Sequence, residues 1–381
     1  ANKIVTRTQA TAKTRIPVSV AAVSTNINAG NRQVSAYETK SKNAKAEKKD
    51  PTPAMVELLS CPNLVPGVSQ VTMGDVQLEP IDHNIAPMDI SGNGTDVSES
   101  AANVEDIDTE DMVNPQLVSV YVNSIYSYLR QLETKFNVRQ NLLAGSDITG
   151  KMRGILLDWL CQVHNKFHLL QETFYITVSI VDRYLQVKPC KRSRLQLVGV
   201  TAMLIASKYE EMHAPEVADF VYITDNAYTK QDVLDMEQDI LYAIDFSLGR
   251  PHCLHFLRRN SKAGEVSATE HMLAKYLMEL AVIEYDMAHL RPSFVAAAAT
   301  CLSMIVLGNS TWSPTLEFYC SYSSDEIQPL VHRLAQLVVN AQTSKLTAVK
   351  TKHSSSKFMQ IARIPQLKSK TLLDLAKKAQ T

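Results

Sequence analysis

The sequence lacks most of the features that mark enzymes, secreted proteins and membrane proteins. Its 381 residues include only six cysteines, none in a C-x-x-C or another tight ligand spacing, so we expect buried, reduced thiols. No apolar run reaches the ~18 to 20 residues that cross a bilayer, and there is no secretory signal. The motifs G-x-x-x-x-G-K, G-x-G-x-x-G, H-E-x-x-H and G-x-S-x-G are also missing. These absences predict an intracellular, non-catalytic protein that needs no cofactor.

The charges balance overall but are unevenly distributed along the chain. Lys and Arg number 39 and Asp and Glu number 39, so nothing global predicts binding to nucleic acid or to an anionic membrane. Residues 1–50 carry ten basic residues against three acids, whereas residues 51–113 carry twelve acids, no Lys or Arg, and six prolines. Such a segment cannot bury enough apolar surface to offset its ordering entropy. We therefore predict a disordered regulatory tail over residues 1–113.

From residue 114 onward, apolar residues recur at the spacings of three and four that are typical of helices. One amphipathic N-terminal helix is expected within 114–135, starting near Leu117. Five helices should follow within 145–248, five more within 249–345, and another in a C-terminal extension, 346–381. The ten expected helices cover 149–168, 172–187, 192–209, a short stretch with Pro215 in its first turn, 229–244, 251–260, 267–288, 292–307, 314–321 and 324–341. The predicted fold is all-α, with two tandem five-helix units.

The middle helices of the two units have similar compositions. Residues 197–207 and 294–304 are both rich in small residues and apolar on nearly every face. A helix of this kind is usually buried, so each is expected to form the centre of its unit. The offset of 97 positions suggests an internal duplication.

Two long segments carry a specific resemblance. Residues 152–160, Met-Arg-Gly-Ile-Leu-Leu-Asp-Trp-Leu, resemble the opening of the cyclin box, and residues 195–211, which end in Ser-Lys-Tyr-Glu-Glu, resemble its third helix. Four shorter segments are similar to B-type rather than A-type cyclins: 248–251, 255–259, 274–280 and 285–287. The resemblance implies two tandem cyclin boxes. It also implies a regulatory subunit that binds and activates a mitotic cyclin-dependent kinase, helps to recruit its substrates, and controls the passage from G2 into mitosis.

The resemblance also assigns a kinase-binding surface in the first box. Lys208 and Glu237 would make polar contacts with the regulatory helix of the kinase and with the loop before it. Tyr209, Leu241 and Phe246 would supply the apolar part of the surface. No bond chemistry is expected of the chain itself, because its binding energy would favour the active arrangement of the kinase.

Met152, Leu156 and Trp159 are spaced as one face of a helix, and taken alone this spacing favours core packing. The resemblance instead implies a shallow patch for Arg-x-Leu peptides of substrates and inhibitors, which would also include Ile155 and Gln196. The family usually has Ala where this chain has Gly154, and a glycine inside a helix costs about 0.5–1 kcal/mol.

Three donors form a candidate phosphate pocket. His271 and Lys275 are four residues apart on one helix face, and Arg258 ends the preceding helix. Together they are expected to bind phosphorylated proteins, more tightly below about pH 6.5 as His271 gains charge. The alternative is ordinary solvated surface charge.

Several alternatives remain open from the sequence. His164 and His168 could suggest a metal site, but no further ligand accompanies them, so hydrogen-bonded or solvated histidines are expected and no metal is predicted. A two-box general transcription factor would share the fold and bind DNA and polymerase, yet it would need a basic face and usually a zinc ribbon. An unrelated helical scaffold would explain the helices but not the two long motifs.

Expectations about turnover and location rest on the resemblance alone. Ubiquitin-ligase machinery is an expected partner, although no Arg-x-x-Leu destruction box occurs within residues 1–113. The matches at Arg139–Leu142 and Arg192–Leu195 fall in or beside predicted helices, so we do not expect accessible degrons there. Shuttling between cytoplasm and nucleus is also expected.

Overall fold

The computed structural model describes residues 104–309 and 312–379. Every regular element in these two ranges is a helix, and no strand occurs in them. The α-helices are α2 (Val122–Lys135), α3 (Gly150–Lys166), α4 (Gln171–Val187), α5 (Leu195–Glu210), α6 (Val217–Ile223), α7 (Lys230–Ala243), α8 (Cys253–Ala263), α9 (Ala268–Ile283), α10 (Pro292–Leu307), α11 (Pro314–Cys320), α12 (Ser324–Ala341), α13 (Ala348–His353) and α14 (Lys370–Lys378). The 3-10 helices are η2 (Thr109–Val113), η3 (Pro115–Leu117), η4 (Ser119–Tyr121), η5 (Arg192–Arg194), η6 (Tyr285–Met287), η7 (Ser356–Phe358), η8 (Ile361–Arg363) and η9 (Pro365–Lys368). The all-α prediction is confirmed.

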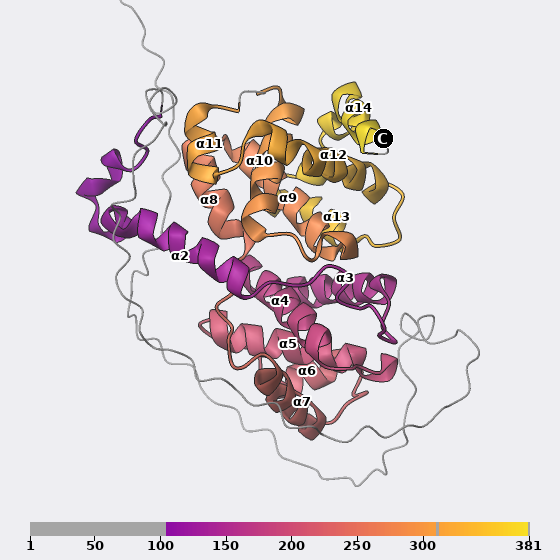
Figure 1. The fold of residues 1–381 in the computed structure, drawn as a ribbon. Coiled ribbons are helices and arrows are strands. Elements are labelled where there is room, and N and C mark those ends of the chain that lie inside the picture. Colours follow the sequence, from indigo (N-terminus) through magenta and orange to yellow (C-terminus); the bar gives the residue numbers. More distant parts are fainter. Residues whose placement is uncertain (1–103, 310–311, 380–381) are drawn as a thin grey trace, which may run out of the picture. The chain divides into compact units, whose positions relative to one another are not determined.

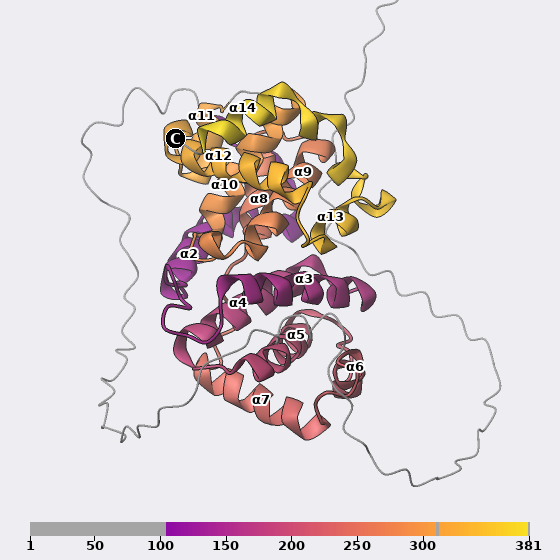
Figure 2. The ribbon, with the colours of Figure 1, turned by 90° about the vertical axis from the view of Figure 1, so that its right-hand side faces the viewer.

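The first five-helix unit, α3 to α7, is built around α5. This helix buries every residue from Leu195 to Ser207 and contacts α3, α4, α6 and α7 (Figure 2). Gly199 allows the close approach of α3, because a Cβ atom at this position would lie 2.8 Å from Cδ1 of Leu156. The expected central helix is therefore confirmed, and it gives the unit a rigid frame.

The second unit, α8 to α12, is built in the same way around α10 (Figure 1). Pro292 occupies the first turn of α10, where its missing N–H costs nothing, and Gly308 ends the helix with a φ of +89°. Helix α10 contacts α8, α9 and α12. Its bounds and those of α12 coincide with the sequence prediction, because proline, serine and glycine mark the ends in the sequence.

Two local predictions were wrong. The N-terminal helix does not begin near Leu117, because Val118 adopts the left-handed region with φ 54° and separates η3 from η4; the α-helix starts only at Val122. The short helix of the first unit starts at Val217 with Glu216 as its N-cap. Pro215 therefore precedes the cap and does not lie in the first turn.

The predicted disordered tail also extends too far toward the folded region. Residues 104–113 are described, and they include the 3-10 helix η2. Asp108 is buried and ion-pairs with Arg259 of α8 at 2.6 Å. The N–H of Glu105 donates to the Thr315 hydroxyl at 3.1 Å. The acidic stretch predicted to be solvated is thus bound by partners about 150–210 positions away. The rest of the predicted tail, residues 1–103, lies outside the described residues.

The C-terminal extension packs against both units. Helix α13 contacts α3 and α9, and the carboxylate of Asp158 accepts the backbone N–H of Ala348 at 2.9 Å. Lys352 and His353 both pair with the buried Glu279 of α9, at 2.8 and 3.1 Å. Helix α14 packs on α12. The single expected helix of this extension is therefore two α-helices, α13 and α14, with three 3-10 turns between them.

A buried arginine, Arg153, links the two units. Arg153 of α3 binds both carboxylate oxygens of Asp182 of α4, at 2.6 and 2.7 Å. The same guanidinium donates to the backbone carbonyls of Ile283 and Val282, at 3.0 and 3.1 Å, where α9 ends. This arrangement satisfies the unpaired carbonyls of a helix end with a cation.

Candidate partner-binding surfaces

The predicted kinase-binding residues lie together at the end of α5 and along α7. Helix α7 begins with a capping box between Thr229 and Asp232, which fixes its start beside α5. In this arrangement Nζ of Lys208 lies 2.8 and 2.9 Å from the two carboxylate oxygens of Glu237. The side chain of Lys208 is 48% exposed. The side chain of Glu237 is only 14% exposed, so the pair is partly exposed to solvent and contributes about 1 kcal/mol.

Aromatic side chains stand exposed beside this ion pair. Tyr209 is 54% exposed and Phe246 is 59% exposed, whereas Leu241 is only partly exposed. Phe246 follows α7 with a φ of 49°, a left-handed turn that ends the helix before it. Exposed aromatic rings that protrude from a rigid helical frame are typical of protein-binding sites.

Two more exposed apolar side chains, not predicted from the sequence, lie at the end of α7 and in the loop after α5. Met212 is 85% exposed and Tyr242 is 72% exposed, with the Tyr242 ring 5.4 Å from that of Phe246. One signal in the sequence could have identified Tyr242: the buried positions of α7 follow a helical period through Val233, Met236 and Ile240, and Tyr242 falls off that stripe. We call Tyr209, Tyr242 and Phe246 the aromatic surface.

The predicted peptide-docking patch is largely part of the core. Met152 is 9% exposed, Leu156 is 2% exposed, and Gln196 is buried as well. Only Ile155 and Trp159 remain partly exposed. The side chain of Leu156 points toward Gly199 of α5, so the spacing of this stripe serves core packing at two of its three positions.

The three donors of the candidate phosphate pocket influence one another electrostatically. The charges of Lys275 and Arg258 both act on His271, and that of Arg258 acts on Lys275. Arg258, however, ion-pairs with the carboxylate of Glu172 in α4. Glu172 could not be assigned to the cluster from the sequence, because it lies 86 positions before Arg258. A carboxylate therefore already satisfies part of the cluster.

The surroundings of His271 do not support the charge that was expected on it below about pH 6.5. Burial, followed by repulsion from Lys275 and Arg258, lowers the pKa of His271 to about 4. Nδ1 of His271 lies 2.7 Å from the Ser261 hydroxyl. His271 is therefore neutral at pH 6.5 and acts as a hydrogen-bonding group.

The histidines and cysteines contribute to packing. Nε2 of His164 lies 2.7 Å from the carbonyl oxygen of Leu170, and burial lowers the pKa of His164 to about 4. His168 is exposed and follows the end of α3 with a φ of 56°. No group of three or more His, Cys, Asp or Glu that could hold a metal occurs in the described parts of the chain. The five cysteines of these parts are all free and buried: Cys161, Cys190, Cys253, Cys301 and Cys320.

The chain was then compared with known proteins. The cyclin N-terminal domain matches residues 124–249, and the cyclin C-terminal domain matches residues 251–367. The G2/mitotic-specific cyclin-B of Patella vulgata is 65% identical over 299 residues, which cover 78% of this chain and 73% of that protein. The chain belongs to the B-type cyclin family. The G2/mitotic-specific cyclin-B of Spisula solidissima is 60% identical over 291 residues, covering 76% of this chain and 68% of that protein.

More distant relatives agree with this assignment. The human G2/mitotic-specific cyclin-B2 is 56% identical over 275 residues, covering 72% of this chain and 69% of that protein. A viral cyclin from herpesvirus saimiri superposes with a TM-score of 0.50 at 23% identity, covering 55% of this chain and 96% of the viral one, and supports the fold alone. B-type cyclins are G2/mitotic regulators of cyclin-dependent kinases. The transcription-factor alternative is not favoured.

The search for a membrane-crossing segment gave a separate result. None of the helices in residues 104–309 and 312–379 is long and apolar enough to span a bilayer.

Proposed function

We propose that this B-type cyclin binds a mitotic cyclin-dependent kinase through the aromatic surface and the Lys208–Glu237 pair, and that binding raises the activity of the kinase. The observation that carries the proposal is the exposure of Tyr209, Tyr242 and Phe246 on one rigid frame. Aromatic residues of this kind often dominate the binding energy of protein interfaces. Burying each ring against the kinase would contribute at most about 1.5–3 kcal/mol.

Activation follows from the rigidity of α5. A protein kinase is active when its β3 lysine pairs with a glutamate on its regulatory helix. A frame buried from Leu195 to Ser207 can hold that helix in the paired position and so shift a two-state equilibrium. Lys208 and Glu237 would exchange their mutual contact for contacts with the regulatory helix and the loop before it.

The test compares two variants that remove exposed aromatic rings. Tyr242→Ala combined with Phe246→Ala should weaken kinase binding at least tenfold and reduce activation at fixed cyclin concentration. Phe318→Ala is the matched control, because Phe318 is 62% exposed on α11 of the second box. Titration calorimetry gives the affinity, and a peptide phosphorylation assay gives the activity. Equal affinities for the double variant and the control would contradict the proposal.

We also propose that Ile155 and Trp159 contact Arg-x-Leu peptides of substrates and inhibitors. Support comes from their partial exposure next to buried Met152 and Leu156, which hold α3 in place. Gln196 is buried at the start of α5 and would position the patch without direct contact.

A phosphorylated partner is the proposed ligand of Arg258, His271 and Lys275. Arg258 supports this role because its side chain is 51% exposed and can exchange the Glu172 carboxylate for a phosphate. The doubly charged phosphate binds a guanidinium more strongly than a carboxylate does, so exchange favours phosphorylated over unmodified proteins.

Turnover by ubiquitin-ligase machinery and shuttling between cytoplasm and nucleus are further proposals that rest on family membership. The Arg-x-x-Leu matches of the folded part do not supply a degron, because Leu142 is 8% exposed and Leu195 is 3% exposed. Any recognition by a ligase would therefore use another part of the protein.

A further inference from the structure

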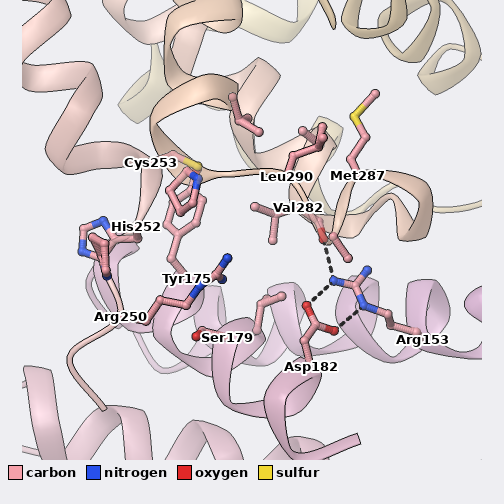
Figure 3. A pocket seen from close by; sticks show the side chains of 16 residues that line it. Arg153, Tyr175, Ser179, Asp182, Arg250, His252, Cys253, Val282, Met287 and Leu290 are labelled. Carbon is pink, nitrogen blue, oxygen red and sulfur yellow. Dashed lines mark hydrogen bonds and ion pairs between the residues drawn. The ribbon is translucent and has the colours of Figure 1, made fainter. Parts of the chain in front are cut away.

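A cavity of about 60 Å³ lies beside the linker between the two boxes, residues 244–252 (Figure 3). Its wall is largely apolar and is formed by residues of both boxes: Val178, Val282, Leu290, Pro292 and Val295. One water needs about 10–15 Å³ on this scale. The cavity therefore has room for a small polyatomic ion.

Arg250 of the linker extends into this cavity (Figure 3). Its Nε atom is buried and has no hydrogen-bond partner among the described residues, where its guanidinium also forms no ion pair. Asp182, which also lines the cavity, and Glu133 attract it, but both Asp182 oxygens bind Arg153 and both Glu133 oxygens accept hydrogen bonds from Ser293. A partly buried cation without an ion-pair partner among the described residues is unfavourable, so the site favours an anion.

A second arginine, Arg183, lies near Arg250. Burial, followed by repulsion from Arg250, lowers the pKa of the neighbouring Arg183 to about 10. Helix α8 begins at the cavity wall with Cys253 and has no acidic residue in its first turn. The positive end of this 11-residue helix adds to the attraction for an anion.

Tyr175 provides a second unpaired donor at the same cavity. Its side chain is 5% exposed, and its hydroxyl has no hydrogen-bond partner in the described ranges. Burial raises the pKa of Tyr175 well above its ordinary value. The hydroxyl therefore keeps its proton and can donate it in a hydrogen bond.

We propose that this cavity binds a small oxyanion of the phosphate class, with the Arg250 guanidinium as its counter-charge and the Tyr175 hydroxyl as a second donor. The ion would contact the linker and both boxes at once, next to Arg153, which bonds Asp182 of the first box and the carbonyls of Val282 and Ile283 in the second. A free ion and a phosphate group at the end of a larger molecule supply the same chemistry. The site is independent of the kinase and peptide surfaces proposed above.

The experiment measures the binding of inorganic phosphate to the full chain by titration calorimetry and by thermal unfolding, against chloride at equal ionic strength. Wild type should bind phosphate saturably and unfold at a higher temperature in phosphate than in chloride. Arg250→Met should weaken phosphate binding at least tenfold, yet unfold at a higher temperature than wild type in chloride, because it removes a partly buried cation that has no ion-pair partner among the described residues. A merely structural Arg250 would instead make Arg250→Met less stable in both salts.

Two further variants test whether phosphate binds in this cavity and not at the surface cluster of Arg258. Arg258→Met disables the surface cluster and should leave the Arg250-dependent binding intact. Tyr175→Phe removes only the hydroxyl and should weaken phosphate binding several-fold. If Arg250→Met fails to fold, the phosphate affinity of Tyr175→Phe tests the proposal instead. In the Arg258→Met background, displacement of phosphate by a phosphoserine peptide would identify a pendant phosphate as the ligand, and no displacement would identify a free ion. Equal phosphate affinities for wild type, Arg250→Met and Tyr175→Phe would overturn the proposal.

Discussion

Asp108 binds Arg259 through both of its carboxylate oxygens, at 2.6 and 2.7 Å, across 151 positions of the chain. Both side chains are buried. The ammonium group of Lys262 approaches the same carboxylate at 3.2 Å, and the Arg259 guanidinium lies 4.6 Å from the centre of the Tyr319 ring. The segment before the first helix is thereby fixed to the second box.

Removing the acid from this pair should destabilise the fold. Asp108→Ala leaves a buried guanidinium without its counter-charge, and we expect a loss of about 3–5 kcal/mol in the free energy of unfolding, measured with urea. Asp106→Asn is the control, because Asp106 is exposed two positions earlier and should cause a much smaller loss. Equal losses for both variants would show that the pair contributes nothing specific.

The same pair predicts a pH dependence. Burial alone would raise the pKa of Asp108, but hydrogen bonds and attraction from Arg259 and Lys262 outweigh it, and the pKa lies below its ordinary value. The stabilisation is therefore fully present above the unfolded pKa, about 3.9, and is lost as the pH falls through the lower folded pKa. Wild type and Asp108→Ala should differ by a constant free energy of unfolding from pH 7 to about pH 5 and converge in more acidic solution.

Two glycines of α3 should respond to alanine in opposite directions. A Cβ atom at Gly154 would meet Cδ1 of Leu346 at an ordinary 3.4 Å, so Gly154→Ala should stabilise the protein by about 0.5–1 kcal/mol. A Cβ atom at Gly150 would lie 2.7 Å from ring atoms of Tyr285. Gly150→Ala should therefore cost about 1–3 kcal/mol. Chemical denaturation of both variants checks the signs, and a shared sign would contradict this account.

Substitutions in α3 should affect either the stability of the fold or peptide docking, depending on whether the side chain is buried. Met152→Ala and Leu156→Ala should each cost about 2–5 kcal/mol, because both side chains are buried. Trp159→Ala should leave a helical, cooperatively unfolding protein and reduce phosphorylation only of substrates that carry Arg-x-Leu. Circular dichroism and paired kinase assays, with and without the motif, make the comparison. If Trp159→Ala slowed both substrates equally, the docking proposal would fail.

Glu172 should limit phosphate binding at the surface cluster. Glu172→Gln removes the carboxylate that pairs with Arg258 and should tighten binding of a phosphoserine peptide several-fold, whereas Lys275→Met should weaken it. Titration of the protein should not raise the affinity of this cluster for a phosphoserine peptide between pH 7 and 5.5, because His271 stays neutral there. Fluorescence anisotropy of labelled phosphorylated and unmodified peptides tests all three statements. An affinity that rises sharply below pH 6.5 would show that His271 does gain charge.

The helices could be predicted from the sequence because their signals are local. The apolar period of α12 and the proline that opens α10 determine bounds that lie within a few neighbouring residues. The family motifs likewise specify where Lys208 and Glu237 fall. The burial of Leu156 was harder to judge, since the same spacing serves a core stripe and a docking patch.

Contacts between distant charges could not be predicted in this way. Asp108 and Glu172 each belong to acidic or mixed stretches that read as solvated, and their partners Arg259 and Arg258 are identified only by the tertiary fold. The lowered pKa of His271 depends in the same way on the packing around it. Sequence periodicity specifies which face of a helix is apolar, but not which charges from other elements meet there.

The contact of Asp158 with Ala348 also constrains the order in which the chain can assemble as it is synthesised. Asp158 is buried, and burial raises its pKa, while the N–H of Ala348 satisfies it from 190 positions further along. The backbone N–H groups of Glu105 and Ile107 likewise gain their hydrogen-bond partners only when Thr315 and Tyr319 have been synthesised. A ribosome-bound chain that has completed α7 can therefore form the kinase-binding helices, but it still lacks α9 and α13, which cover one side of α3, and the groups that hold residues 105–107. Nascent chains should thus gain protease resistance in two steps, the second only after residue 348 has left the ribosome.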